Sequence, residues 1–274
     1  MTYAYIVEDS SFENIMDDPD FYLGMFNESK VLAFPELNLN AEQHLQVMNA
    51  LGFKNTSQGA EDHYDTLKSE WATNSPDEAL INWHLENLQM KNPQIVAGWN
   101  MTTFTCPEGH GNTGMVNMIE VYEDLDVETK EFYEQVNYVF MHDPSGRASW
   151  MDEAREEMLL GNKVIPLESV PTEELPVRKA VVSHPRTGET TLRYMCSPNC
   201  VVLPLQDKNM DQTNEQKRIF DKEIKEKIRD PEYQLWWEWA KGDLVIVDLF
   251  CIYHSVKGGF TVGERILDRI YEYG

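Results

Sequence analysis

The sequence predicts a mixed α+β fold, and three observations support this prediction. A β-branched and aromatic run over residues 244–253 is typical of a strand buried on both faces. Residues 213–228 carry apolar side chains at helical spacing, and residues 179–194 show the strand, turn and strand pattern of a β-hairpin. Because 42% of the 274 residues are hydrophobic, the chain can build one large core around these elements.

The N-terminal part predicts a strand followed by a helix. Lys30–Phe34 has the composition of a short buried strand. Asn40 can cap a helix, and Gln43 stands three residues later, where it completes a capping box. We expect this helix to end at Gly52.

The segment from about residue 120 to 178 is strongly acidic and has few strand signals. We expect it to form an insertion of helices and loops outside the core, with its charges on a solvated face. Beyond it, Lys179–Ser183 and Thr190–Tyr194 predict the two strands of the hairpin, which a turn at His184–Gly188 would join.

The next segment predicts one amphipathic helix. Thr213 stands at its expected start, and Gln216 is placed to complete a capping box. Glu223 and Lys227 are four residues apart, a spacing that favours an ion pair on a helix. The apolar face would comprise Phe220, Ile224 and Ile228.

The last long element is the buried strand. Gly242 and Asp243 mark a turn, and Leu244–Tyr253 then forms a continuous apolar run. We expect His254 to stand at the end of this strand.

No internal repeat or Gly/Ser-rich linker divides the chain, so residues 1–274 are expected to form a single domain.

Overall composition limits the classes of partner. The net charge of −24 repels phosphate backbones and anionic membrane surfaces, so we expect a small-molecule substrate rather than nucleic acid or a membrane. Met1–Ser10 lacks the pattern of a secretory signal, which favours a cytoplasmic location. Whether the chain forms a homo-oligomer is left open.

The cysteines allow one alternative interpretation. Cys106 and His110, together with Cys196 and Cys200, could close a tetrahedral zinc site. Both pairs have three intervening residues, whereas zinc ribbons usually have two, so unrelated thiols are the favoured interpretation. A zinc-stabilised interaction module remains the alternative.

Two short motifs could supply part of an iron site. In an extended strand, residues two apart point to the same side, so His63 with Asp65, or His84 with Glu86, could bind one metal ion. With 7 histidines and 47 acidic residues, chance alone gives roughly one such pair. The second pair follows the apolar segment Leu80–Trp83, which suits a core strand, whereas the first lies in a polar segment. We therefore choose His84 and Glu86, although a buried structural histidine beside a surface acid would show the same pattern.

A resemblance along nearly the whole chain favours the iron site. The residues that carry it are 31–52, Trp83–Glu86, Gly111–Thr113, Val181–Gly188, Asp230–Trp239, Gly242–Ile246, His254, Arg265 and Arg269. In these positions the sequence resembles the taurine dioxygenase family of Fe(II)- and 2-oxoglutarate-dependent oxygenases, which includes clavaminate-synthase-like members.

The resemblance implies a fold and a set of site residues. The fold would be a double-stranded β-helix, or jelly roll, flanked by helices. His84, Glu86 and His254 would bind Fe(II), and Arg265 with Thr113 would hold the distal carboxylate of 2-oxoglutarate. Arg269 would face the substrate.

The same resemblance implies the reaction. A small polar metabolite, amino-acid-like or anionic, would be hydroxylated or otherwise oxidised with dioxygen, and succinate and carbon dioxide would be released. Most members have Asp where this chain has Glu86, and taurine-specific members have Asn where it has Leu80, which weakens taurine as the substrate. A non-catalytic jelly-roll protein that binds metal is the second alternative, because it would need neither Arg265 nor Thr113.

Overall fold

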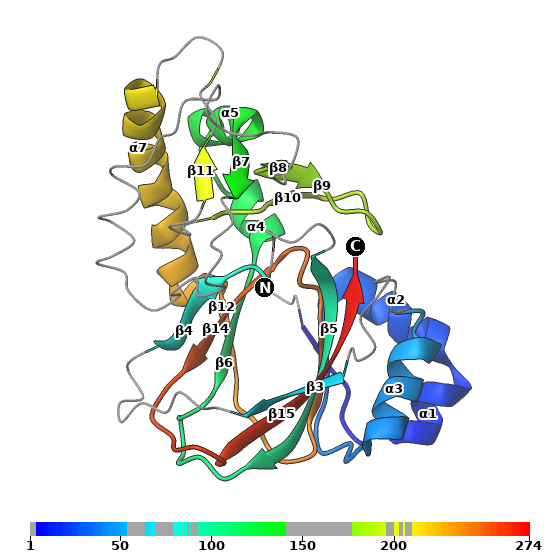
Figure 1. Cartoon of the computed structure of the whole chain (residues 1–274). Helices are drawn as coiled ribbons and strands as arrows, with labels where there is room; N and C mark the ends of the chain where they lie inside the picture. Colours follow the sequence, from blue (N-terminus) through cyan, green and yellow to red (C-terminus); the bar gives the residue numbers. More distant parts are fainter. Residues whose placement is uncertain are drawn as a thin grey trace. The chain divides into compact units, whose positions relative to one another are not determined.

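A computed structural model of the chain describes residues 4–53, 64–68, 79–86, 88, 93–140, 177–195, 200–202, 205 and 210–274. It divides into two compact units. The first comprises Met1–Glu86, Asn92–Met115 and Leu235–Gly274, and the second comprises Asn87–Lys91 and Val116–Gln234. Helices and sheets occur in both, which confirms the predicted mixture of α and β structure (Figure 1). No described helix is long and apolar enough to cross a membrane.

A six-stranded sheet forms one side of the first unit. Its strand order is β1 (Tyr5–Ile6), β2 (Val31–Phe34), β13 (Leu244–Val247), β5 (Gln94–Phe104), β15 (Arg265–Tyr273) and β3 (Tyr64–Lys68). The pair β1 and β2 is parallel, and the other neighbours are antiparallel. All residues of β2 and β13 are buried, as expected for wholly apolar strands inside a sheet.

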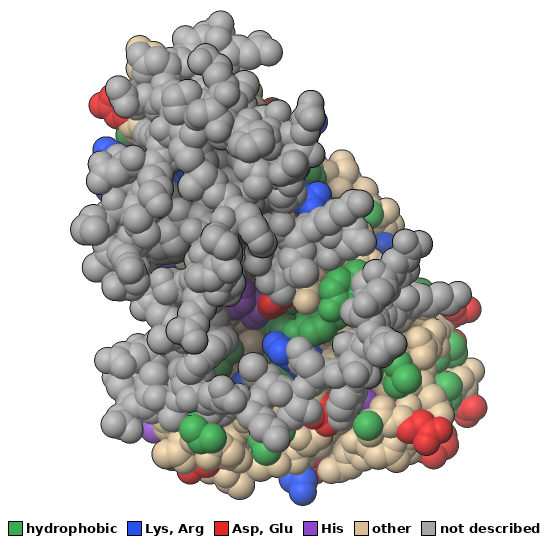
Figure 2. Space-filling view, viewed as in Figure 1, with side chains coloured by type: hydrophobic (Ala, Val, Ile, Leu, Met, Phe, Trp, Pro, Cys, Tyr) green, Lys and Arg blue, Asp and Glu red, His purple; other side chains and the backbone are tan. Residues whose placement is uncertain are grey.

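Three helices cover one face of this sheet: α1 (Phe12–Asp17), α2 (Pro19–Ser29) and α3 (Ala41–Ala50). The predicted capping box of α3 is present, since the side chains of Asn40 and Gln43 each accept a hydrogen bond from the other's backbone N–H. Residues from the helices and from alternate sheet positions form a continuous core, which includes Phe26, Phe34, Val47, Met48, Leu244, Ile246 and Ile270. At the lower right of Figure 2, where these helices lie in the same view of Figure 1, acidic side chains (red) are scattered over the surface.

A four-stranded sheet carries the other strands near the predicted site. Its order is β12 (Gln234–Trp237), β6 (Thr113–Asn117), β14 (Ile252–Lys257) and β4 (Ala79–His84). The strands β14 and β4 are antiparallel, with His254 directly opposite His84.

The apolar run Leu244–Tyr253 is not one strand, and this prediction was wrong. It forms β13 and the start of β14, which belong to different sheets. Asp248 stands at the break, where its backbone carbonyl accepts hydrogen bonds from the N–H groups of Cys251 and Ile252. As a consequence, His254 lies inside β14 and not at the end of a strand.

The predicted Gly242-Asp243 turn is present before β13. Gly242 has a φ of +94°, and a Cβ there would lie 2.3 Å from the Asn38 side chain, so only glycine fits. The Asp243 carboxylate accepts hydrogen bonds from the backbone N–H of Glu36 and from Nε1 of Trp237. These bonds fix the turn against the loop that follows β2.

The second unit holds the described part of the acidic insertion. It contains α4 (Met118–Glu123), α5 (Val127–Gln135), β7 (Asn137–Phe140), β8 (Val177–Lys179), β9 (Val181–Ser183), β10 (Thr190–Leu192), β11 (Cys200–Val202), α7 (Met210–Arg229) and the short 3₁₀ helix η2 (Pro231–Tyr233). The predicted hairpin is the antiparallel pair β9 and β10. Strand β7 was not predicted, and residues 141–176 lie outside the described part of the chain.

Helix α7 confirms the predicted amphipathic helix but differs in detail. It begins at Met210, so Thr213 lies within it and is not its N-cap. Glu223 does not pair with Lys227: its carboxylate accepts hydrogen bonds from the backbone of Asp126 and from the Thr129 hydroxyl. Tertiary hydrogen bonds therefore replace the local ion pair.

Candidate metal centre

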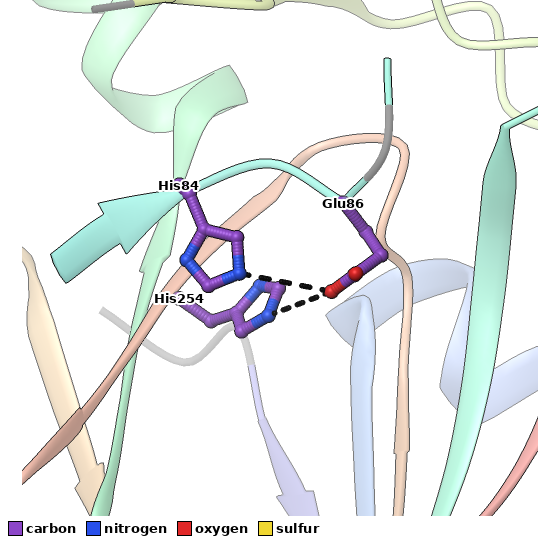
Figure 3. A group of neighbouring side chains, drawn as sticks. All are labelled: His84, Glu86 and His254. Atoms are coloured by element: carbon purple, nitrogen blue, oxygen red, sulfur yellow. Dashed lines mark ion pairs between the residues drawn. The ribbon is translucent and has the colours of Figure 1, made fainter. Parts of the chain in front are cut away.

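Three metal-ligating side chains gather in the first unit. One ligand atom from each of His84, Glu86 and His254 lies within 4.8 Å of the other two. The Glu86 carboxylate is 3.3 Å from Nε2 of His254 and 3.7 Å from Nε2 of His84 (Figure 3). The two histidines and one carboxylate selected from the sequence thus point toward one another.

The sheet positions the two histidines and the chain beyond it positions the acid. Since His254 is opposite His84 in the β14–β4 ladder, the two rings lie side by side with their centroids 4.1 Å apart. Strand β4 ends at His84, and Glu86 lies in the bend that follows, with Leu85 fully buried between them. We expected His84 and Glu86 to point to the same side because they would alternate along one strand. Glu86 lies beyond the end of that strand, so the bend, and not strand alternation, directs its carboxylate toward the histidines.

The protonation states suit a cation. Burial alone would raise the pKa of Glu86, but hydrogen bonds and charge attraction from His254 and His84 hold that pKa well below its ordinary value. Burial, together with repulsion from His84, lowers the pKa of His254 to about 4. Near neutral pH the site therefore presents a carboxylate and a neutral His254 imidazole, which are the forms that bind metals.

This donor set fits iron. Two imidazoles and one carboxylate form the arrangement found in non-haem Fe(II) oxygenases, where the remaining coordination positions stay open. In the space-filling view, histidine, acidic and basic side chains are visible beside hydrophobic ones near the middle of the picture (Figure 2).

Arg265 and Thr113, the predicted carboxylate-binding pair, are in contact. Arg265 is only 2% exposed, and its guanidinium donates to the Gly111 carbonyl at 3.0 Å and to the Thr113 hydroxyl at 3.1 Å. Burial lowers the pKa of Arg265 to about 10, so the side chain still carries its charge at neutral pH. A buried cation beside a hydroxyl is suited to an anionic ligand group.

Arg269 lies on the same face of β15 as Arg265, because the two are four positions apart along an extended strand. Its cross-strand neighbour in β5 is Trp99. The centroid of the Trp99 ring lies 5.3 Å from the centroid of the His254 ring. Cross-strand partners share a face, so Arg269 is on the side of the sheet that faces the metal ligands. Its guanidinium is 5.5 Å from the Tyr271 ring.

The alternative sites are not assembled in the described part of the chain. His63 and Cys196 lie outside it, and of Asp65 and Cys200 only the backbone, in β3 and β11, is described. No cluster of metal-ligating side chains among the described residues contains Cys106 or His110. The zinc site therefore stays a prediction without support here.

Sequence reasoning assigned no role to two tryptophans at the site. Trp99 packs against His254, and Nε1 of Trp239 donates to the Thr113 hydroxyl at 2.9 Å. Trp239 was part of the family resemblance, but nothing in the sequence around it indicates that its indole N–H bonds to Thr113. Trp99 has no local signal beyond its place in an apolar strand.

Comparisons with known proteins agree with this geometry. The family described as "Taurine catabolism dioxygenase TauD, TfdA family" matches residues 17–271. An alkylsulfatase from Acinetobacter baylyi is 27% identical over 164 residues, which are 60% of this chain, and the match spans about half (48%) of that relative's length.

Solved structures show the same fold. A taurine dioxygenase from Burkholderia xenovorans superposes with a TM-score of 0.67 at 16% identity, over 99% of this chain and 87% of the other. AAD-2, in complex with Mn(II) and N-oxalylglycine, superposes with a TM-score of 0.65 at 16% identity, over 100% of this chain and 95% of the other. With the family match covering nearly its whole length, the chain belongs to the TauD/TfdA family of dioxygenases, which use Fe(II), 2-oxoglutarate and dioxygen.

Proposed function

We propose that this protein is an Fe(II)- and 2-oxoglutarate-dependent dioxygenase that hydroxylates, or otherwise oxidises, a small anionic or amino-acid-like metabolite. Succinate and carbon dioxide would be released. The observation that carries the proposal is the convergence of His84, Glu86 and His254 within 4.8 Å of one another, in a chain that belongs to this family. The non-catalytic alternative explains these three residues but gives no reason for the buried cation at Arg265.

The metal-binding step rests on the three ligands. His84, Glu86 and His254 would hold Fe(II), which when bound couples the oxidative decarboxylation of 2-oxoglutarate to the activation of dioxygen. The neutral imidazole of His254 and the ionised Glu86 need lose no proton to bind the ion near neutral pH.

The cosubstrate step rests on Arg265 and Thr113. The guanidinium can meet a carboxylate with two charge-assisted hydrogen bonds, which fixes the orientation of the ligand as well as its affinity. Since Arg265 is almost fully buried, its attraction for the distal carboxylate of 2-oxoglutarate is weakly screened by solvent.

The substrate step rests on Arg269. A second cation on the face of β15 that carries Arg265 would bind an acidic group of the substrate. Two of the similar proteins are named a taurine dioxygenase and an alkylsulfatase, names that refer to compounds with a sulfonate or sulfate group. For this chain we propose a carboxylate, sulfonate or phosphonate on a small molecule, with neither nucleic acid nor a membrane as partner.

The fold proposal follows the same logic. The six-stranded and four-stranded sheets, which are mostly antiparallel, would be the two halves of a double-stranded β-helix within one catalytic domain. The passage of the chain from β13 to β14, from one sheet to the other, supports this architecture.

One experiment tests the proposal directly. The purified protein, loaded anaerobically with Fe(II), should develop the visible charge-transfer band of a 2-oxo acid complex when 2-oxoglutarate is added. On admission of air, succinate formation should rise in the presence of one class among a panel of amino acids, sulfonates, sulfate esters, phosphonates and betaines. Binding of Fe(II) without binding of 2-oxoglutarate would instead support the non-catalytic metal-binding protein.

A further inference from the structure

The hydroxyl group of Thr113 receives two hydrogen bonds at once. Nε1 of Trp239 donates to its oxygen at 2.9 Å, and the Arg265 guanidinium donates to the same oxygen at 3.1 Å. The indole N–H and the guanidinium can only donate, whereas a hydroxyl has two acceptor lone pairs and one proton. Both lone pairs of the Thr113 oxygen are therefore occupied, and its proton is left as the only group that can make a further bond.

This arrangement is closed to solvent. Thr113 is 2%, Trp239 5% and Arg265 2% exposed, so water does not compete for these bonds. Among the residues that the structure describes, none accepts the hydroxyl proton of Thr113. A buried donor left without an acceptor is costly, which means that the site is built to receive an acceptor there.

From these contacts we infer that Trp239 is a positioning residue that sets the rotation of the Thr113 hydroxyl, so that its proton is donated to the distal carboxylate of 2-oxoglutarate. The inference rests on the proposed function and adds a residue to it. Without the indole N–H, one lone pair of Thr113 is free and the hydroxyl can turn to other orientations. The carboxylate then loses part of a preorganised donor pair, the Thr113 hydroxyl and the Arg265 guanidinium.

The indole ring has a second contact that must be separated from this effect. The Arg265 guanidinium lies over the Trp239 ring, with its Cζ atom 6.0 Å from the ring centroid. Trp239→Phe keeps an aromatic ring while it removes the N–H. Replacement of Trp239 by β-(3-benzothienyl)alanine keeps the whole bicyclic shape and replaces the N–H by sulfur, so it serves if the Phe variant does not fold.

The matched control is Trp237→Phe. Trp237 is a neighbouring tryptophan, 8% exposed, whose Nε1 donates to the Asp243 carboxylate at 3.2 Å and not to Thr113. Its loss removes a buried indole hydrogen bond of the same kind. A general effect of weakened packing would therefore appear in both variants.

The measurement is the dissociation constant of 2-oxoglutarate, from titration of the charge-transfer band of the anaerobic Fe(II) protein and from calorimetry. We expect Trp239→Phe to weaken binding roughly five- to tenfold, as the loss of one buried hydrogen bond predicts, and Trp237→Phe to leave it unchanged. In the Thr113→Val background, where no hydroxyl remains to be oriented, Trp239→Phe should add nothing further. In the Thr113→Ser background, which retains the hydroxyl, its effect should persist.

The outcomes separate the inference from the function on which it rests. If the wild-type protein does not bind 2-oxoglutarate, the proposed function fails. If it binds but the Trp239→Phe and benzothienyl variants bind equally well, only the role of Trp239 is wrong. An equal effect of Trp239→Phe in the wild-type and Thr113→Val backgrounds would also overturn it, because the indole would then act independently of the hydroxyl.

Discussion

His254 in β14 lies directly opposite His84 in β4, and their rings are tilted by 49° to one another with their centroids 4.1 Å apart. Two residues far apart in the sequence are thus joined by strand register, and a shift of the register by one residue would turn one of the imidazoles to the other face of the sheet. The relative placement of the two histidines in the candidate metal centre therefore depends on the β14–β4 pairing.

The first prediction concerns the metal. Alanine at His84, Glu86 or His254 leaves only two protein ligands, so each variant should lose Fe(II) and the succinate-forming activity. The iron content after gel filtration, measured by atomic spectroscopy, gives the answer without an activity assay. Alanine at His63 or Asp65 should leave the iron content unchanged, and loss of iron in the His63 variant would show that the other pair is the true site.

The second prediction concerns Arg265. Replacement by leucine removes the charge that would face the distal carboxylate, and such losses at buried charge pairs cost about 2–5 kcal/mol. The midpoint of the anaerobic 2-oxoglutarate titration should rise accordingly, while Fe(II) still binds. An unchanged midpoint would exclude Arg265 as the carboxylate ligand.

The third prediction concerns Arg269. If it binds an acidic group of the substrate, Arg269→Ala should raise KM for the substrate much more than KM for 2-oxoglutarate. The slow decarboxylation of 2-oxoglutarate without substrate should persist, since Arg265 and the metal ligands are intact. Arg269→Lys is the matched variant, because it retains the charge but not the planar fork. Equal losses in both reactions, or a best substrate without an acidic group, would contradict this role.

The fourth prediction concerns stability in acid. His44 in α3 is fully buried at the close approach to Gly98 of β5, and burial lowers its pKa from 6.5 to about 3. Below about pH 6.5 the unfolded chain therefore binds a proton that the folded protein excludes, so stability falls as the pH falls toward 3. Between pH 7 and pH 5 this histidine should remove about 2 kcal/mol from the free energy of unfolding.

The comparison that isolates this effect uses two variants from the same helix face. His44→Leu should lose this part of the pH dependence in urea unfolding, whereas Met48→Leu should keep it. Met48 also packs against Gly98 but has no titratable group. If wild type and His44→Leu lose equal stability between pH 7 and pH 5, His44 is not the acid-sensitive group.

Much of the local structure follows from short-range patterns. Asn40 and Gln43 predict the start of α3 because a capping box involves only residues within one turn, and β2 follows from an apolar run of strand-forming residues. The hairpin of β9 and β10 is likewise local, since its turn residues and both strands are contiguous. The choice of His84, Glu86 and His254 required the family resemblance in addition, because a two-residue motif occurs by chance in so acidic a chain.

Other features depended on contacts between distant segments. Apolar periodicity shows that Leu244–Tyr253 is buried, but only pairing with β2 and β5 on one side of Asp248, and with β4 on the other, divides it between two sheets. In the same way, Glu223 lies four residues from Lys227 yet bonds to Asp126 and Thr129, because tertiary donors satisfy its carboxylate better than an exposed ion pair. The bond from Trp239 to Thr113 joins the segment after β12 to the start of β6, which no local pattern relates. Local sequence encodes turns, caps and buried faces, whereas the pairing of strands, and with it the geometry of the site, is decided by the packing of the whole chain.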